Sequence, residues 1–461
     1  MPTPDIMEKL VALSKRRGFV YPGSEIYGGL ANAYEYGPLG VELKRNIQNE
    51  WWKTFIQRRS DMLGLDSSII LHPKVWEASG HVAGFADAMI DCKHCQTRMR
   101  ADHLIEDFFA AKDCAINVEG KTEEELDAVI RENKIPCPVC KKFDWTPVRK
   151  FNLLFETHIG IVPEAQSKVY LRGETAQGIF VTFKNITNSM RTKLPFGVGQ
   201  IGKSFRNEIT KGNFIFRTLE FEQAEIEYFF DPDESDWKKL FSAWQQSMWD
   251  FVTHVLGVNA QNLRWREHSD EERSFYSKRT EDLEYRFPFG FKELWGLAYR
   301  TDYDLKQHMK YSGADLSYVD AASGKKFVPH VIEPAVGINR LMAMVMIESY
   351  VEEEGRVVMK LPAQLAPYKA AVFPLLANKP ELVALAKSIY DDLRKDHMIA
   401  WDDRGNIGKR YYAQDEIGTP WAITIDFDSL HDQAVTVRDR DTMQQERIPI
   451  AALRQFITDR L

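Results

Sequence analysis

The fold is decided by a stretch that reads Ser204-Phe205-Arg206-Asn207-Glu208 and, after a short polar loop, Phe216-Arg217-Thr218-Leu219-Glu220-Phe221-Glu222-Gln223-Ala224-Glu225-Ile226-Glu227-Tyr228. Both halves alternate as β-strands do, with successive side chains on opposite faces. One face is therefore expected to carry Arg206 with Glu208, and Arg217, Phe221, Gln223 with Glu225. Glutamate is uncommon in strands, yet the second half has four. This pattern favours a functional face, and the alternative is a solvated face with cross-strand ion pairs.

The side chains on this face fit a site that activates a carboxylic acid. Arg206 is expected to hold a carboxylate against a phosphate, because a planar cation with several donors offsets the repulsion between two anions. Phe221 is expected to stack on a purine ring. Glu225, farther along the same face, is expected to accept hydrogen bonds from an α-ammonium group.

Composition excludes several classes of protein. The chain has 461 residues, enough for two or three domains, with 44% hydrophobic and 28% charged residues. No stretch approaches the ~20 consecutive apolar residues of a membrane-spanning helix, and the segment from Met1 to Lys15 lacks the apolar core of a signal peptide. We therefore expect a soluble, cytoplasmic protein with no membrane partner. A net charge of -7 argues against uniform electrostatic binding of nucleic acid, so an RNA partner would be recognised by shape and a few contacts.

The order of predicted elements indicates an α+β protein with two domains. Apolar spacing predicts a helix from Val41 to Arg59, strand-rich blocks at 151–230 and 285–336 with antiparallel pairing, and a buried helix from Leu341 to Ile347. Beyond Pro367, strands alternate with helices, which predicts an α/β domain with a largely parallel sheet. We expect an antiparallel-sheet domain at 1–365, interrupted by a cysteine-rich insertion at about 81–150, and a second domain at 366–461.

All five cysteines fall in the insertion. Four form the pairs Cys92-Lys93-His94-Cys95 and Cys137-Pro138-Val139-Cys140, which have the spacing of a four-thiolate structural zinc site. The forty-one residues between the pairs exceed what a compact zinc ribbon needs, so reduced, metal-free cysteines are the alternative. Cys114, between the pairs, is predicted to be a buried thiol.

The 204–228 stretch resembles motif 2 of the class II aminoacyl-tRNA synthetases, in which an aromatic-Arg-x-Glu strand precedes a strand with Arg-x-x-x-Phe. Gly28-Gly29 to Pro38, with the helix that follows, is similar to motif 1, and Gly337-Ile338-Asn339-Arg340 is similar to motif 3. Alone, Arg340 would more often be a cap on its apolar helix. In this family the motif 1 proline lies at a dimer interface and the motif 3 arginine grips the ATP γ-phosphate. The resemblance implies an ATP-dependent ligase that forms a homodimer.

Other segments resemble the dimeric glycine enzymes of this family. They are Arg100-Ala101-Asp102-His103, Leu171 to Phe180 and Lys292 to Leu305. The resemblance implies that the chain activates glycine with ATP and Mg²⁺ to glycyl-adenylate and transfers glycine to the 3′ end of tRNA(Gly). Where Glu-Pro-Ser is expected, the sequence has Glu333-Pro334-Ala335, which removes a hydroxyl. Glycine has no smaller competitor, so an editing domain is not required.

The same resemblance implies the site residues. The catalytic residues would be Arg206, Glu208, Glu293 and Arg340, with Glu293 as the magnesium contact. ATP would be surrounded by Arg206, Asn207, Glu208, Phe216, Arg217, Thr218, Leu219, Glu220, Phe221, Glu293, Leu294, Gly337, Ile338, Asn339 and Arg340. Glycine would be surrounded by Arg100, Glu174, Phe221, Glu222, Gln223, Ala224, Glu225, Glu333, Pro334, Ala335, Val336 and Gly337.

The C-terminal region resembles the anticodon-binding domain shared by the glycine, histidine, proline and threonine enzymes. Its segments Trp401 to Tyr411 and Gly418 to Trp421 carry this resemblance, and Arg404, Lys409, Arg410 and Tyr411 are candidates for contacts with RNA. Two other functions stay open at this point. One is a non-catalytic RNA- or DNA-binding accessory protein with a synthetase fold, and the other is a class II ligase for proline, threonine or serine.

Overall fold

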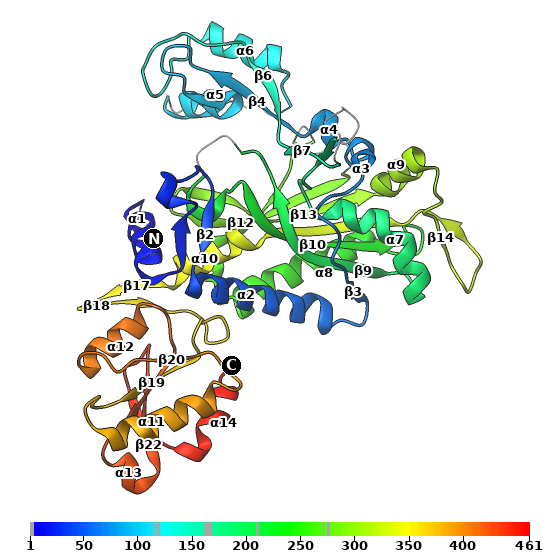
Figure 1. The fold of residues 1–461 in the computed structure, drawn as a ribbon. Coiled ribbons are helices and arrows are strands. Elements are labelled where there is room, and N and C mark those ends of the chain that lie inside the picture. The colour runs from blue at the N-terminus through cyan, green and yellow to red at the C-terminus, as the bar shows by residue number, and fades with distance from the viewer. Residues whose placement is uncertain are drawn as a thin grey trace.

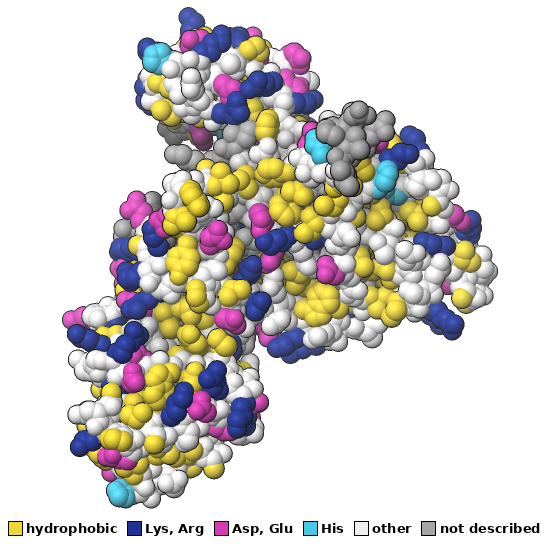
Figure 2. Space-filling model, viewed as in Figure 1, with side chains coloured by type: hydrophobic (Ala, Val, Ile, Leu, Met, Phe, Trp, Pro, Cys, Tyr) yellow, Lys and Arg dark blue, Asp and Glu magenta, His cyan; other side chains and the backbone are white. Residues whose placement is uncertain are grey.

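The chain forms three lobes. The computed structural model describes residues 4–461 except 113, 115, 117, 119, 161–167, 209–211, 271 and 274–276. A central body carries one projecting lobe, drawn mainly in cyan, and a C-terminal lobe, drawn in orange and red (Figure 1). Charges of both signs are mixed over the visible face of all three lobes (Figure 2). Each lobe has a hydrophobic core of its own.

The central body is built on a seven-stranded sheet. Its strand order is β11-β12-β13-β16-β10-β9-β3, and every neighbouring pair is antiparallel except β3 with β9. The antiparallel pairing that the strand-rich blocks predict is therefore confirmed. In that order the strands are Leu263–Glu267, Arg279–Phe287, Gly290–Thr301, His330–Gly337, Glu220–Phe230, Phe196–Phe205 and Met62–Gly64.

Helices bury one face of this sheet. α2 (Pro38–Trp52), α8 (Trp237–Asp250) and α10 (Ile338–Ser349) share the largest core with it, and α1 (Pro4–Arg17) packs on α10. On β10 the even-numbered residues Ala224, Ile226 and Tyr228 enter this core, as strand alternation requires. Each fully buried large apolar side chain contributes roughly 1.5–3 kcal/mol. The odd-numbered residues of β10 are left facing the other side.

The predicted helices of the central body are present, but others were missed. α2 begins at Pro38, the favoured first position of a helix, and continues as a wider turn at Lys53–Gln57. The block at 151–230 also contains α7 (Ala176–Met190), and the block at 285–336 contains α9 (Tyr303–Ser312). In α7 the buried residues recur at helical spacing: Ala176, Ile179, Phe180, Phe183 and Ile186.

Short elements connect these parts. They are β1 (Val20–Pro22), β2 (Tyr34–Tyr36), α3 (Pro73–Ala78), α4 (His81–Gly84), β7 (Glu156–His158), β8 (Lys168–Tyr170), β14 (Tyr318–Val319), β15 (Lys326–Phe327), β17 (Tyr350–Glu353) and β18 (Arg356–Met359).

The projecting lobe is the cysteine-rich insertion. Its sheet has the order β5-β4-β6, with strands Arg98–Arg100, Ala86–Asp91 and Arg149–Asn152. α5 (Ala101–Ala110) and α6 (Glu123–Glu132) pack on each other. α6 has three glutamates in its first turn, Glu123 to Glu125, and Thr122 with Glu125 forms a capping box at its start.

The C-terminal lobe has a five-stranded sheet in the order β20-β19-β21-β22-β23. The strands are Ile399–Trp401, Ala370–Pro374, Trp421–Ile425, Ala434–Asp439 and Gln445–Pro449. The prediction of a largely parallel sheet holds for only half of it, because β19 pairs parallel with β20 and β21, whereas β22 pairs antiparallel with β21 and β23. Chain connections explain this, since no helix long enough to cross the sheet separates the last three strands; α13 (Ser429–Asp432) is one turn. The other helices are α11 (Pro380–Leu393), α12 (Ile407–Asp415) and α14 (Leu453–Thr458).

None of the helices in the described part of the chain combines the length and apolar character that crossing a lipid bilayer requires.

Candidate active site

A pocket of about 300 Å³ opens on the face of the central sheet that α2, α8 and α10 leave uncovered. Its floor comes from β10, β13 and β16, and its walls come from the residues after β9 and the start of α10. Sixteen residues implied by the sequence line it: Glu174, Arg206, Glu208, Phe216, Arg217, Thr218, Phe221, Gln223, Glu225, Glu293, Glu333, Ala335, Val336, Gly337, Asn339 and Arg340.

Three arginines make one end of the pocket cationic. Arg206 donates from Nε to the carbonyl of Gly173 at 3.1 Å, and its guanidinium lies between two aromatic rings, 5.2 Å from the centre of Phe85 and 5.3 Å from that of Phe221. These contacts hold Arg206 in one orientation. Arg217 lies 3.8 Å from Glu208, with both side chains partly exposed.

Arg340, at the start of α10, is tied to β13. Its Nη1 lies 3.0 Å from Glu293 Oε2, and its guanidinium lies 4.7 Å from the centre of the Phe216 ring. Arg340 lowers the pKa of Glu293, which stays an acceptor. Burial raises the pKa of nearby Asp282, and Glu293 raises it further. Two carboxylates beside three guanidinium groups form an environment suited to an anion together with a divalent cation.

The other end of the pocket is acidic and buried. Glu225 is 1% exposed and accepts from Gln223 Nε2 at 2.8 Å and from the hydroxyl of Thr175. Burial, then the charges of Glu333 and Glu174, raise the pKa of Glu225 well above its ordinary value. Glu333 also has a raised pKa, chiefly because of burial. Such a cluster of carboxyl groups favours a cationic ligand.

Arg300 is the cation that holds this end together. It is 4% exposed, donates to both oxygens of Asp304 at 2.8 and 2.9 Å, and pairs with Glu333. Arg300 lies in the segment Lys292 to Leu305 but was not among the predicted site residues. One feature of the sequence could have indicated it: Arg300 is a charged residue on the same strand as the core residues Leu297 and Tyr299. His268, Thr280 and Asp282, from β12 and the residues before it, also line the pocket and were missed.

Several residues that the family resemblance gave for ATP or glycine lie outside the pocket, because of strand geometry. Glu222 faces the opposite side of the sheet, where it pairs with Lys44 of α2 at 3.0 Å. Glu220 is half exposed and pairs with Lys203. Four others are core or buried residues, namely Ala224, Leu294, Pro334 and Ile338.

Three further implied residues also lie outside the pocket. Arg100 belongs to the insertion, where it pairs with Asp87 at 3.1 Å and with Asp102 at 2.5 Å. Asn207 and Leu219 are fixed by their backbones: the N–H of Asn207 donates to Leu153, and the carbonyl of Leu219 accepts from Arg206.

Ala335 stands on the pocket floor between two strands. It is opposite Glu225 on β10 and Gly296 on β13. A serine here would add a hydroxyl beside Glu225. With alanine, the carboxyl group of Glu225 accepts from two donors among the described residues, the hydroxyl of Thr175 and Nε2 of Gln223.

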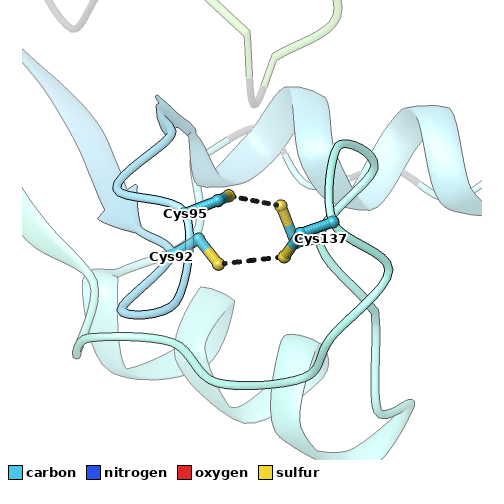
Figure 3. A group of neighbouring side chains, drawn as sticks. Cys92, Cys95 and Cys137 are labelled. Atoms are coloured by element: carbon cyan, nitrogen blue, oxygen red, sulfur yellow. Dashed lines mark hydrogen bonds between the residues drawn. The ribbon is translucent and has the colours of Figure 1, made fainter.

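The four paired cysteines meet at one point of the insertion. Cys92 Sγ lies 3.6 Å from Cys140 Sγ, and Cys95 Sγ lies 3.6 Å from Cys137 Sγ (Figure 3). All four sulfurs lie within 4.8 Å of one another, with no disulfide between them. Four thiolates around tetrahedral zinc, with bonds of about 2.3 Å, would be about 3.8 Å apart. The arrangement therefore fits that ion. Cys114 is exposed, so its predicted burial is wrong.

Two of the predicted RNA contacts in the C-terminal lobe have structural roles instead. Arg410 is 2% exposed and donates to the carbonyls of Pro374 and Gly405. The hydroxyl of Tyr411 bonds to Thr424 within the sheet. Arg404, with 88% of its side chain exposed, stays available for a partner.

Comparison with known proteins identifies the family. Residues 157–350 match the tRNA synthetase class II core domain (G, H, P, S and T), and residues 369–460 match the anticodon binding domain. A glycine–tRNA ligase from Caldanaerobacter subterraneus subsp. tengcongensis is 52% identical over 100% of both chains. The chain belongs to the glycine–tRNA ligase family. It is an ATP-dependent aminoacyl-tRNA ligase, and the class II fold is confirmed.

Other members of the family are equally similar. The ligase from Clostridium acetobutylicum is 50% identical, covering 99% of this chain and 98% of that one. The ligase from Geobacillus thermodenitrificans is 52% identical, covering 99% and 97%. Among solved structures, prolyl-tRNA synthetase from Cryptosporidium parvum has a TM-score of 0.65 at 13% identity, covering 99% of this chain and 77% of that one. That likeness concerns the fold alone.

Proposed function

We propose that this ligase forms glycyl-adenylate in the pocket of the central sheet, with ATP at the cationic end and glycine at the acidic end. One observation carries the proposal: guanidinium groups gather at one end and buried carboxyl groups at the other, within a single pocket of about 300 Å³. A triphosphate matches the first set of charges and an α-ammonium group matches the second.

In the activation step, a carboxylate oxygen of glycine attacks the α-phosphorus of ATP. The bond between that phosphorus and the bridging oxygen breaks, and pyrophosphate leaves. Arg206 holds the carboxylate and α-phosphate together, and Phe221 supports the purine ring. Arg217 and Arg340 balance charge on the departing pyrophosphate. No side chain acts as a covalent nucleophile, so rate enhancement comes from orientation and electrostatics.

In the transfer step, the terminal hydroxyl of tRNA(Gly) attacks the carbonyl carbon of glycyl-adenylate. An ester forms between glycine and the tRNA, and AMP leaves. Gln223 stays hydrogen-bonded to Glu225, so the acidic end keeps its shape while the nucleotide end changes.

The residues present fit a magnesium ion bound with ATP. Glu293 and Asp282 would hold it, since carboxylates with phosphate oxygens are its usual ligands. When bound, the ion supplies charge neutralisation for the triphosphate. Arg340, now paired with Glu293, would turn toward phosphate oxygens.

The enzyme would select glycine over larger amino acids because side chains already occupy the acidic end of the pocket. A side chain on the amino acid would collide with a pocket that already contains Glu174, Glu225 and Glu333. Rejection by collision is strong, whereas a missing methylene changes binding by only about 1–3 kcal/mol. Glycine has no smaller natural competitor, so this one-sided filter is sufficient.

We also propose that the four cysteines hold a structural zinc ion that fixes the shape of the insertion and takes no part in the reaction. The sulfur separations support this. Removal of the ion should unfold the insertion before the central body.

We further propose that two identical chains form a homodimer, the α2 type of this family. The interface would be formed by the segment before the helix Pro38–Trp52. Ile26, Tyr27 and Leu30 there are 89%, 88% and 61% exposed, an apolar surface that a second copy would cover. Separate cores support a catalytic domain at 1–365, with the insertion at about 81–150, and an anticodon-binding domain at 366–461. A cytoplasmic location follows from the tRNA substrate and the free cysteines.

The test is ATP–pyrophosphate exchange with purified protein and single amino acids. Glycine should support exchange, and proline, threonine, serine and alanine should not. Exchange with another amino acid but not with glycine would contradict the proposal.

A further inference from the structure

The base of the cysteine-rich insertion lies against the acidic end of the pocket. The insertion leaves the central body through α4 and returns through the end of β6 (Figure 1). Hydrogen bonds join these two segments. Asn152 Nδ2 donates to the carbonyls of His81 and Val82 at 3.2 and 2.9 Å. The backbone N–H of Leu153 donates to Phe85 at 2.9 Å. The base is thus a hydrogen-bonded unit.

His81 is the residue of this base that faces a pocket carboxylate. Its Nε2 lies 3.3 Å from Glu174 Oε2, and its side chain is only 11% exposed. On the other side of the ring, Nδ1 is 2.7 Å from the hydroxyl of Ser79. A carboxylate only accepts hydrogen bonds, so Nε2 carries the hydrogen. Ser79 therefore fixes the ring with its donor aimed at Glu174.

Packing fixes the same ring against rotation. The rings of Trp76 and His81 meet edge-on, with their centres 5.2 Å apart. The centre of the Phe85 ring lies 5.1 Å from that of His81, and these two rings are tilted against each other. Gly80, just before it, has φ of +84°, a left-handed conformation that favours glycine. Phe85 also lies against Arg206, so the base contacts both ends of the pocket.

Glu174 depends on this histidine because burial disfavours a charged carboxylate. Burial would raise the pKa of Glu174, yet the contact with His81, and after it Arg300, hold that pKa well below its ordinary value. Gln177 Nε2 donates to the other oxygen at 2.9 Å. Glu225 and Glu333 lie close by, and the charge of Glu174 raises the pKa of each of them. Without His81, one oxygen of Glu174 would lose its donor.

We propose that His81 is a positioning residue for glycine: through Nε2 it holds Glu174 oriented toward the α-ammonium group, and it links the insertion to the amino-acid end of the pocket. The inference rests on the proposed role of Glu174 in glycine binding. His81 itself does not touch the substrate.

The experiment compares His81→Phe with His81→Gln in ATP–pyrophosphate exchange. Phenylalanine keeps the ring packing on Trp76 and Phe85 but has no donor, whereas glutamine keeps an N–H donor without the ring. Loss of a hydrogen bond to a charged group predicts a KM for glycine raised about 10–100-fold in His81→Phe. His81→Gln should recover most of this loss, and the KM for ATP should stay within about twofold in both.

A matched control is His254→Ala, since 76% of that side chain is exposed on the far helical layer. It should leave both KM values unchanged. If His81→Phe matches the wild type while His81→Gln is impaired, the role of His81 is packing and the inference is wrong. Equal rises in both KM values would contradict it as well.

Glu174→Gln tests separately whether Glu174 binds the α-ammonium group of glycine and whether His81 positions Glu174. If that variant keeps the wild-type KM for glycine, Glu174 does not bind the ammonium group, and both ideas fail. If Glu174→Gln raises the KM for glycine but His81→Phe does not, only the role of His81 is rejected.

Discussion

The two ends of the pocket differ in how their charges are held. At the nucleotide end, Arg217 and Arg340 are partly exposed and pair with carboxylates that a polyanion and its cation would rearrange. At the amino-acid end, Arg300 is 4% exposed and its partner Asp304 is 3% exposed, in a network built before any ligand arrives. In the proposed function, the first end would adapt to a flexible triphosphate, and the second would be rigid enough to select a small ligand by its size.

The largest expected effect comes from Arg206, which belongs to both ends. Arg206→Ala removes the group that we propose joins carboxylate and α-phosphate, so glycine-dependent ATP–pyrophosphate exchange should fall about 10²–10³-fold. Arg404→Ala, a change of an 88% exposed arginine in the C-terminal lobe, should leave exchange at the wild-type rate. A fall of less than about threefold in Arg206→Ala would remove Arg206 from the chemistry.

A pair of variants should separate the two ends. Arg217→Ala removes a triphosphate partner and should raise the KM for ATP about tenfold, with little change for glycine. Glu333→Gln removes an ammonium partner, and the KM for glycine should rise instead, also about tenfold. Steady-state exchange kinetics measure both. If each variant changed both KM values alike, the division of the pocket into two ends would be wrong.

Metal analysis tests the insertion, which is separate from both ends. One zinc ion per chain is expected, and Cys137→Ser should lose it and lower the temperature at which the insertion unfolds. Cys114→Ser is the matched control, because that thiol is exposed and lies outside the cluster. Unchanged metal content in Cys137→Ser would exclude the four-thiolate site.

The smallest effect concerns Glu227, behind the acidic end. Glu227 is fully buried close to Glu225 and Glu333, and burial followed by the charge of Glu333 raises its pKa well above the ordinary value. A raised folded-state pKa gives stability that is present below the unfolded pKa of about 4.3 and is lost as the pH rises through the folded-state value. Glu227→Gln stays neutral, so its advantage over the wild type should grow with pH, to about 1–3 kcal/mol.

Thermal unfolding at pH 5 and pH 8 would measure the effect of Glu227→Gln. The control is Glu354→Gln, in the exposed turn between β17 and β18, which should behave as the wild type at both values. A Glu227→Gln variant that is less stable than the wild type at pH 8 would mean that this carboxyl group is ionised and stabilising.

Most of the residues that line the pocket could be predicted from the sequence. Arg206, Phe221 and Arg340 could be found because they lie in short motifs where a charged or aromatic residue breaks the local pattern. Strand alternation also placed Gln223 and Glu225 on the pocket face, as the structure has them.

Residues that act through distant partners could not be found this way. His81 reaches Glu174 only because the insertion returns beside the body, and Arg300 matters because it holds Glu333. The helix α7 was missed since its apolar residues fell within a segment judged by its β-forming composition. Arg410, by contrast, has a motif-like position but supports a turn.

The central claim is that the two substrates occupy ends of opposite charge, and a crystal structure with a non-hydrolysable glycyl-adenylate analogue tests it most directly. The account predicts the α-ammonium group among Glu174, Glu225 and Glu333, and the phosphate mimic against Arg206. An analogue bound with its ammonium group at Arg217 and Arg340, or outside this pocket, would contradict it.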